Sequence, residues 1–214
     1  MISEVDSGGL LTLGWAHKMA GRGFLTEERF ANAIRGLSVE MSNLCGTAHL
    51  GSVLSCADIL AAIFGSVDTP KKDDRGKADF VLSKGHAALG LYSALLLVGE
   101  ISNEQFLSYS QKGSLLEEHP THKVPTVLHP TGSLGHGLGF MAGRLHALEI
   151  LGRNQGGIVL MSDGECNEGS VWEAALYATS KQVPGLVAVV DSNGFQATGP
   201  VTESYGDAQI AGIF

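Results

Sequence analysis

Basic residues are scarce in this sequence. The chain has 214 residues, with 14 lysines and arginines against 22 aspartates and glutamates, and its formal net charge is −8. Proteins that bind nucleic acid neutralise phosphates with clusters of Lys and Arg, and no such cluster occurs here. The composition therefore argues against a nucleic-acid partner. Any bound phosphate must be held by backbone N–H groups, a metal ion, a few histidines or another chain.

Cysteine is also rare, and long apolar runs are missing. The three cysteines, Cys45, Cys56 and Cys166, are odd in number and have no Cys-x-x-Cys spacing. That usage is typical of reduced thiols in an intracellular protein. The acidic start MISEVDSGG does not resemble a secretion signal, and no window approaches the length of a membrane span. We expect a cytoplasmic protein.

The bulk composition indicates a soluble globular chain. Apolar residues make up 44% of the sequence and charged residues 17%. A chain of this length suits one domain with a substantial core. We expect a single domain over residues 1–214, with a helical N-terminal leader over about 1–24.

Apolar spacing predicts helices that alternate with short apolar strands. In the first helix, over residues 25–46, Thr26 is a candidate cap. A second helix is expected from a cap at Ser55 to Gly65. The apolar stripe of the first helix consists of Phe30, Ile34, Leu37 and Met41. Further helices are expected within 84–99, 102–111, 135–152 and 170–182, and strands at 80–83, 158–161 and 186–190.

This alternation predicts an α/β fold, with a doubly wound, mostly parallel sheet flanked by helices. The strands are continuously apolar, as is typical when both faces of a sheet are covered. Residues 112–137 have little periodicity and contain several histidines, and a loop of this length is usually functional or disordered. In such sheets ligands bind beyond the carboxyl ends of the strands.

Two polar side chains follow two of these strands. Asp163 comes directly after IVLM, and Asn193 follows LVAVVDS, with a helix between them. If the two strands are neighbours, the carboxylate and the amide lie at the same sheet edge. Their oxygens suit Mg²⁺ or Ca²⁺, and Mg²⁺ commonly combines a few protein ligands with substrate phosphates. Ordinary strand-end turns also favour Asp-Gly and Asn-Gly, so the spacing alone leaves both interpretations open.

A longer pattern resembles one enzyme family. The segment SDGECNEGSVWEAALYAT followed by LVAVVDSNGFQATGP resembles the thiamine-diphosphate motif, in which a Gly-Asp-Gly-like turn and a helix precede an Asn. The chain is similar to the N-terminal, diphosphate-binding part of transketolases, and most similar to the split kind, in which the pyrimidine-binding part is a separate polypeptide. The other matching stretches, in family order, are AHLGSVLSCADILAAIFG, FVLSKGHAALGLYSALLLVGEIS, EEHP and TGSLGHGLGFMAGR.

The resemblance implies a cofactor site made of thiamine diphosphate and Mg²⁺ or Ca²⁺, in a fold of the diphosphate-binding type. It implies that Asp163, Asn193 and the main-chain carbonyl of Phe195 bind the metal ion. It further implies that Gly164 lies against the diphosphate and that His86 donates a hydrogen bond to it.

The same resemblance implies roles around the reacting carbons. Gly132 and Leu134 are expected at the aminopyrimidine and thiazolium rings of the cofactor. His49 and His119 are expected as catalytic residues at the hydroxyl and carbonyl oxygens of the donor, since histidine transfers protons near neutral pH. Glu168 resembles a glutamate at the interface between two active sites.

Each histidine also has a structural interpretation. His86 could cap a helix, and His49 could be a buried polar residue. His119 has competitors in the same loop, because His122 and His129 are close in sequence. The remaining histidines, His17, His136 and His146, are expected to be structural or solvent-facing.

The sequence departs from the family pattern in three places. Ser162 replaces the first glycine of Gly-Asp-Gly and is expected to crowd the turn. The stretch VPTVLHP stands where relatives have a Gly and a Glu. The chain ends at YGDAQIAGIF, whereas relatives continue with a segment that supplies a further histidine, so the end of the family domain is expected to be missing.

We therefore expect a transketolase subunit that transfers a two-carbon ketol unit from a ketose (phosphate) to an aldose (phosphate). In the family, the glutamate that activates the cofactor lies in the pyrimidine domain. The resemblance thus implies an obligate pyrimidine-domain partner in a two-by-two heterotetramer. Two alternatives stay open. One is another thiamine-diphosphate enzyme component, of the deoxyxylulose-phosphate synthase or 2-oxoacid dehydrogenase type, and the other is a non-catalytic regulatory paralogue.

Overall fold

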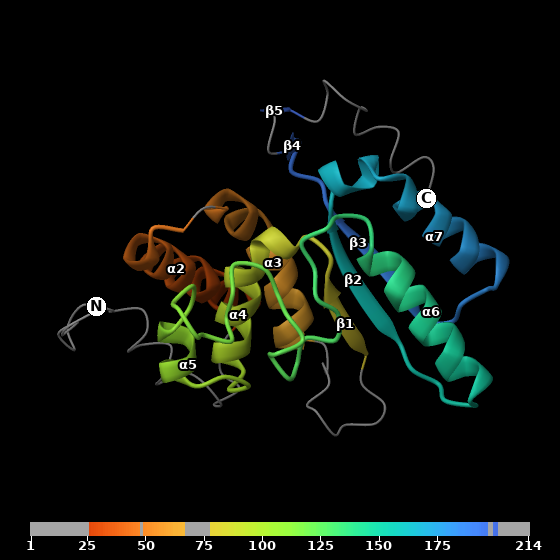
Figure 1. Cartoon of the computed structure of the whole chain (residues 1–214), viewed down its shortest axis with the longest axis horizontal. Coiled ribbons are helices and arrows are strands. Elements are labelled where there is room, and N and C mark those ends of the chain that lie inside the picture. Colours follow the sequence, from red (N-terminus) through yellow and green to blue (C-terminus); the bar gives the residue numbers. More distant parts are fainter. Residues whose placement is uncertain (1–25, 48, 67–77, 197–198, 201–214) are drawn as a thin grey trace. The chain divides into compact units, whose positions relative to one another are not determined.

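The computed structural model describes residues 26–47, 49–66, 78–196 and 199–200 (Figure 1). They form two compact units whose segments alternate along the sequence. The helical unit contains the described residues up to 66 together with 89–118, and the sheet unit contains 78–88 and the described residues from 119 onward. The expected leader over about 1–24 lies outside the described residues, and the single-domain organisation stays a prediction.

The helical unit begins with α2 (Glu27–Cys45). Thr26 caps this helix, as predicted, because its side-chain oxygen accepts a hydrogen bond from the Arg29 N–H at 3.4 Å. Gly46 ends it in the left-handed region, with φ of 65°. The predicted stripe of Phe30, Ile34, Leu37 and Met41 is buried.

The second predicted helix starts earlier than expected. Helix α3 runs over Leu50–Ser66, so Ser55 lies inside the helix and does not cap it. The apolar period extends back to Leu50 and Val53, which adds a turn of helix before the Ser55 signal. Helix α4 (Ala88–Leu97) packs closely on α3, because a Cβ placed at Gly90 would lie 2.9 Å from a methyl carbon of Val53.

Helix α5 (Asn103–Leu107) is shorter than the predicted 102–111. Ser102 and Gln105 form a reciprocal capping box at its start, with hydrogen bonds of 3.2 Å and 2.8 Å. No regular helix or strand occurs between α5 and α6 (Gly137–Ile150), which confirms the predicted long loop. All three cysteines are free thiols.

The sheet unit contains three parallel strands in the order β1-β2-β3. Their bounds are Asp79–Leu82 for β1, Gly157–Ser162 for β2 and Leu186–Asp191 for β3. Short 3-10 helices follow the first two strands, η1 (Gly85–Ala87) and η2 (Gly164–Asn167). After β3, the two-residue strands β4 (Phe195–Gln196) and β5 (Gly199–Pro200) pair in antiparallel fashion.

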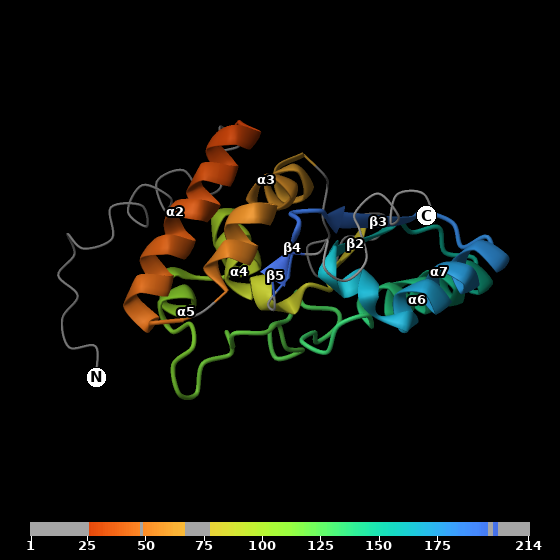
Figure 2. The same ribbon diagram turned by 90° about the horizontal axis from the view of Figure 1, so that it is seen from above.

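Helices α6 and α7 (Gly169–Ser180) lie alongside each other, as Figures 1 and 2 both show. They pack on one face of the sheet around the buried Val159 and Met161 of β2. Leu160, on the opposite face of the same strand, is also fully buried. The central strand is therefore covered on both faces, as its continuous apolar sequence predicts.

Strand β3 differs from this expectation. Val187 is 50% exposed and Ala188 is exposed as well. Among the described residues, β3 is an edge strand whose one neighbour is β2. The fold is nevertheless the predicted α/β class, with a parallel sheet flanked by helices. Within the described part of the chain, no helix is both long and apolar enough to cross a membrane.

Candidate cofactor and metal site

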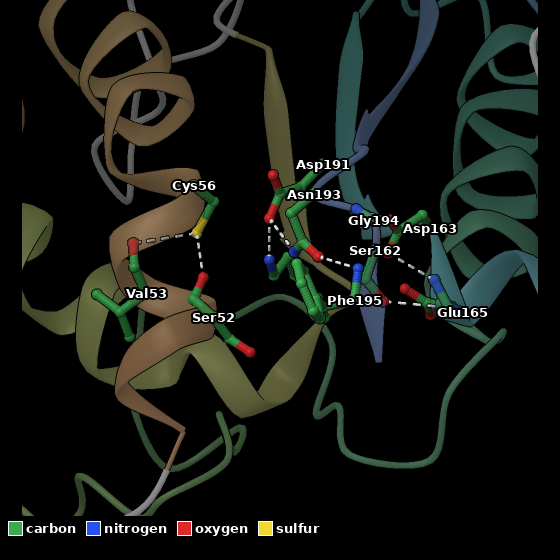
Figure 3. A network of polar contacts seen from close by, with 12 residues as sticks. Ser52, Val53, Cys56, Ser162, Asp163, Glu165, Asp191, Asn193, Gly194 and Phe195 are labelled. Atoms are coloured by element: carbon green, nitrogen blue, oxygen red, sulfur yellow. Dashed lines mark hydrogen bonds and ion pairs between the residues drawn. The ribbon is translucent and has the colours of Figure 1, made fainter. Parts of the chain in front are cut away.

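The carboxyl ends of β2 and β3 lie side by side. The two strands are neighbours, and their register pairs Ser162 with Asp191. The N–H of Asp163, one residue beyond β2, donates to the Asp191 carbonyl at 3.3 Å. Because β2 and β3 are neighbouring strands, Asp163 and the loop around Asn193 lie at the same edge of the sheet (Figure 3).

The carboxylate of Asp163 is fully buried at this edge. Its Oδ1 accepts the Gly164 N–H and its Oδ2 accepts the Gly194 N–H, both at 2.8 Å. No cationic side chain in the described part of the chain forms an ion pair with it. A buried carboxylate without a cation is costly, and a bound metal ion is one way to neutralise it.

Asn193 lies in the loop after β3, and hydrogen bonds to its amide oxygen and from its amide nitrogen fix the orientation of the group. Its Oδ1 accepts the Phe195 N–H at 2.8 Å, and its Nδ2 donates to Asp191 Oδ2 at 3.3 Å. Pro200, the register partner of Phe195, has no N–H to donate to the Phe195 carbonyl.

These groups fit a hard cation by their chemistry. A carboxylate, an amide oxygen and a main-chain carbonyl are oxygen donors of the kind that Mg²⁺ and Ca²⁺ prefer. Among the described residues, no group of three or more His, Cys, Asp or Glu side chains is placed to hold a metal ion. A metal ion at this edge would therefore depend on Asp163, Asn193 and the main chain at Phe195.

The turn after β2 is close-packed at Gly164. A Cβ placed there would lie 2.9 Å from the Gln196 Cβ, so the β4 strand leaves no room for a side chain. The neighbouring Ser162 is accommodated rather than crowded, because its hydroxyl accepts the Glu165 N–H at 3.2 Å. The serine thus supplies a hydrogen bond that a glycine could not.

A buried ion pair at the strand ends was not predicted. Lys84 follows β1 and its ammonium group binds the carboxylate of Asp191, and both residues are buried. Both residues adjoin strand ends that the sequence identifies. A charged residue directly after an apolar strand was the signal that could have marked them.

Glu165 is a second group that sequence reasoning missed. It is fully buried in η2, and its Oε1 accepts the Ser83 hydroxyl and the Gly135 N–H, the latter at 2.7 Å. Its Oε2 is buried without a hydrogen-bond partner among the described residues. Burial raises the pKa of this carboxyl, and hydrogen bonds from Ser83 and from backbone N–H groups together with the charge of Lys84 oppose the rise.

The predicted diphosphate histidine, His86, lies in η1 directly after β1 and is half-buried. The preceding Gly85 lies against the loop that contains Gly132, because an added Cβ would lie 2.9 Å from the Gly132 nitrogen. The Gly132 backbone has φ of 144°, a conformation that favours glycine. These contacts bring the end of β1 and the start of the TGSLG segment together.

His119 is the loop histidine that lies against this segment. A Cβ placed at Gly132 would lie 3.2 Å from Cδ2 of the His119 ring. His129 instead stacks on Phe140, with ring centroids 4.4 Å apart and an interplanar angle of 15°. Burial, followed by the charge of His136, lowers the pKa of His129. His122 is exposed.

The other predicted residues of the sheet unit surround the same loop. Glu168 precedes α7 and is exposed, and a Cβ placed at Gly135 would lie 2.7 Å from the Glu168 Cβ. Leu134 is half-buried. His136 is exposed at the start of α6, and His146 contacts the Tyr177 hydroxyl at 2.6 Å, so neither lies in the cluster at the strand ends.

His49 belongs to the helical unit. It is exposed, precedes α3 and has φ of 69°, which is unusual for a residue with a side chain. Its expected role as a catalytic residue stays a prediction. His17 lies outside the described residues.

Comparisons with known proteins agree with this geometry. Residues 26–212 match the family described as transketolase, thiamine diphosphate binding domain. Transketolase-like protein 2 of Homo sapiens is 38% identical over 180 residues, which cover 82% of this chain and 29% of that protein. A subunit of the apulose-4-phosphate transketolase of Phocaeicola vulgatus is 37% identical over 170 residues, covering 77% of this chain and 60% of that protein.

The fold matches solved structures as well. A transketolase from Leishmania mexicana superposes with a TM-score of 0.80 at 24% identity, covering 88% of this chain and 30% of that chain. The chain thus spans less than two thirds of the length of these relatives. Since the match extends over most of its own length and includes both strand ends, the chain belongs to the transketolase family and carries its thiamine diphosphate-binding domain.

Proposed function

We propose that this chain is the diphosphate-binding subunit of a thiamine-diphosphate-dependent transketolase. The reaction is the transfer of a two-carbon ketol unit from a ketose, or its phosphate, to an aldose, or its phosphate. One observation carries the proposal: a buried carboxylate without a cation, Asp163, shares a sheet edge with the oriented amide of Asn193. A divalent cation would supply the positive charge that this edge lacks, and the same cation would bind the diphosphate.

In this proposal, Asp163, Asn193 and the Phe195 carbonyl hold Mg²⁺ or Ca²⁺. Gly164 lies against the diphosphate, and His86 donates a hydrogen bond to it. Lys84 does not take part directly, because its ammonium group is fully buried on Asp191. The bound thiamine diphosphate supplies the electron sink for cleavage of the carbon–carbon bond of the donor.

The remaining residues act around the rings and the substrate. Gly132 and Leu134 pack against the aminopyrimidine and thiazolium rings. His119 and His49 exchange protons with hydroxyl and carbonyl oxygens of the donor, and the position of His119 beside Gly132 supports the first assignment. Glu168 acts at the contact with a second active site, and its exposure supports that role.

The active site is completed by a pyrimidine-domain polypeptide in a two-by-two heterotetramer. Two observations support a partner. The Phocaeicola vulgatus relative is itself described as one subunit of its enzyme. In addition, the sheet unit exposes large apolar side chains, a composition typical of interaction surfaces. They are Ile150, Leu151, Leu176, Tyr177, Val187 and Phe195.

Titration calorimetry with thiamine diphosphate and Mg²⁺ tests the site, first on the chain alone and then with the pyrimidine-domain polypeptide of a neighbouring reading frame. We expect metal-dependent binding that tightens with the partner, and a complex whose mass by light scattering fits two copies of each chain. Absence of binding in both cases would reject the function and leave a non-catalytic role.

Product analysis tests the reaction. The assembled enzyme should convert a ketose donor and an aldose acceptor into a lengthened ketose and a shortened aldose. Release of carbon dioxide from a 2-oxoacid donor, without ketol transfer, would assign the chain to another class of thiamine-diphosphate enzyme. Normal transfer by the purified chain alone would disprove the need for a partner.

A further inference from the structure

The loop over Thr131–Gly137 is tied at several points to the strand ends and to the start of α7. The Thr131 hydroxyl donates to the Leu82 carbonyl at 2.8 Å. At the other end, the Gly137 N–H donates to the Ser83 hydroxyl oxygen at 3.2 Å. The loop is therefore fixed to the end of β1 on both sides of its glycine-rich centre.

The peptide groups on both sides of Gly135 are held by the segment that follows β2. The Gly135 N–H donates to Glu165 Oε1 at 2.7 Å, and the Gly135 carbonyl accepts the Ser170 hydroxyl at 3.0 Å. The same Glu165 oxygen accepts the Ser83 hydroxyl. Glu165 thus joins the end of β1, the centre of the Thr131–Gly137 loop and the turn of Asp163.

Close packing confirms that this arrangement leaves little freedom. A Cβ placed at Gly135 would lie 2.4 Å from the Ser170 hydroxyl oxygen, and one placed at Gly137 would lie 2.4 Å from the Ser83 hydroxyl oxygen. Gly135 therefore has no room to move toward the start of α7, and Gly137 has none to move toward Ser83 at the end of β1. The hydrogen bond from Gly135 to Glu165 prevents movement of the loop in the opposite direction.

We propose that Glu165 is a positioning residue that holds the Thr131–Gly137 loop in register with the Asp163 turn. It is fully buried, so it acts through Gly135 and does not touch the cofactor. This inference rests on the proposed function, in which the loop meets the rings of thiamine diphosphate and the turn meets its diphosphate. One carboxylate then sets the distance between the two protein segments that bind the two ends of the cofactor.

The proposal predicts that loss of Glu165 affects the binding of two ligands differently. Inorganic pyrophosphate with Mg²⁺ needs the metal ligands and His86 but not the Thr131–Gly137 loop, whereas thiamine diphosphate also needs the loop in register with the Asp163 turn. Glu165→Ala should weaken thiamine diphosphate binding about 10- to 100-fold, as is typical when a residue that orients a ligand-binding group is lost. Pyrophosphate binding should weaken much less. Glu165→Gln, which keeps an acceptor for Gly135, should restore most of the loss.

Both affinities are measured by calorimetry, for the chain alone or with its partner, whichever binds thiamine diphosphate in the wild type. Amide hydrogen exchange gives a second readout without ligand. In Glu165→Ala, protection should fall in residues 131–137 and stay unchanged in α2. Glu149→Ala, which removes an exposed carboxylate on α6, is the matched control and should change neither readout.

If Glu165→Ala does not fold, Glu165→Asp replaces it, because the shorter carboxylate keeps its charge and fails to reach Gly135. An equal loss for both ligands, or unchanged binding of both, would overturn the positioning role. Loss of exchange protection throughout the chain would show a structural role instead. Failure of the wild type to bind either ligand would reject the proposed function itself, and that outcome is distinct from the others.

Discussion

The helical unit and the sheet unit bury different chemistry. In the helical unit, α2 and α3 bury almost entirely apolar side chains. The buried Ser38 hydroxyl forms a 3.1 Å hydrogen bond with the Ser93 hydroxyl, which donates to the Leu89 carbonyl at 2.8 Å. In the sheet unit, Lys84, Asp191, Asp163 and Glu165 are all buried near the strand ends.

The difference indicates that the residues that stabilise the fold and the residues that bind ligand lie in different parts of the chain. Apolar burial stabilises a fold, whereas buried charged groups contribute little or reduce stability unless they are paired. Asp163 and the Oε2 atom of Glu165 lack such pairing within the described residues. Mutations of buried apolar residues in the helical unit should therefore change folding, and mutations at the strand ends should change ligand binding.

The sharpest test of this comparison is Asp163→Ala. Loss of the carboxylate should remove the metal ion and weaken thiamine diphosphate binding by about 100-fold or more. The free energy of unfolding should change less, because the loss of the hydrogen bonds from Gly164 and Gly194 is offset by removal of a buried carboxylate that has no cation. Calorimetry and urea denaturation measure the two effects. Asp58→Ala, at an exposed carboxylate of α3, is the control, and wild-type cofactor affinity in Asp163→Ala would contradict the metal assignment.

The opposite pattern is expected for Ile34→Ala in α2. Ile34 is fully buried, and its truncation should lower the free energy of unfolding by about 2–5 kcal/mol. Val39→Ala, on an exposed position of the same helix, should change it by about 0.5 kcal/mol or less. Urea denaturation measures both. If Ile34→Ala changed cofactor affinity at low temperature, where the variant is folded, the separation between the two units would fail.

A smaller effect on binding is expected for His86→Ala. If the proposed function holds, the variant loses one hydrogen bond to the diphosphate, worth about 1.5–3 kcal/mol when it is charge-assisted. Calorimetry with Mg²⁺ and thiamine diphosphate measures the loss. His122→Ala, at an exposed histidine in the long loop, is the matched control. Equal affinities for His86→Ala and the wild type would leave His86 as a helix-start residue without a ligand role.

The smallest expected effect is on the cap of α2. Thr26→Ala removes the oxygen that accepts the Arg29 N–H and should lower the free energy of unfolding by about 1 kcal/mol. Thr26→Ser keeps the oxygen and should preserve most of that stability. Denaturation curves of the three proteins give the comparison. A change in cofactor affinity in either variant would be unexpected, because the cap lies in the helical unit.

Local patterns in the sequence predicted the helical unit well. The Thr26 cap, the Gly46 end and the buried stripe of α2 follow from short-range rules. The start of α3 was missed because Ser55 is a good capping residue that happens to lie inside an apolar period. The capping signal at Ser55 and the apolar period from Leu50 predict different starts for this helix. The helix begins at the earlier position, where Val53 is buried.

The candidate site was predicted in part. Positions at strand ends follow from the apolar runs, so Asp163 and Asn193 could be placed after two strands. That β2 and β3 are neighbours stayed a condition until the structure showed their pairing. Side-chain partners over long sequence separations could not. The pairing of Lys84 with Asp191 and the contact of Glu165 with Gly135 depend on how a loop and a strand pack, which no local pattern encodes.

The burial of Lys84 makes its amine a reporter of conformation. Reagents that acylate lysine need a neutral amine in contact with water, and this one is enclosed on Asp191. Surface lysines such as Lys181 will react in the native protein, whereas Lys84 will react when the sheet edge opens. The extent of its labelling, read by mass spectrometry, would thus measure how often the Lys84–Asp191 ion pair breaks and the amine reaches water.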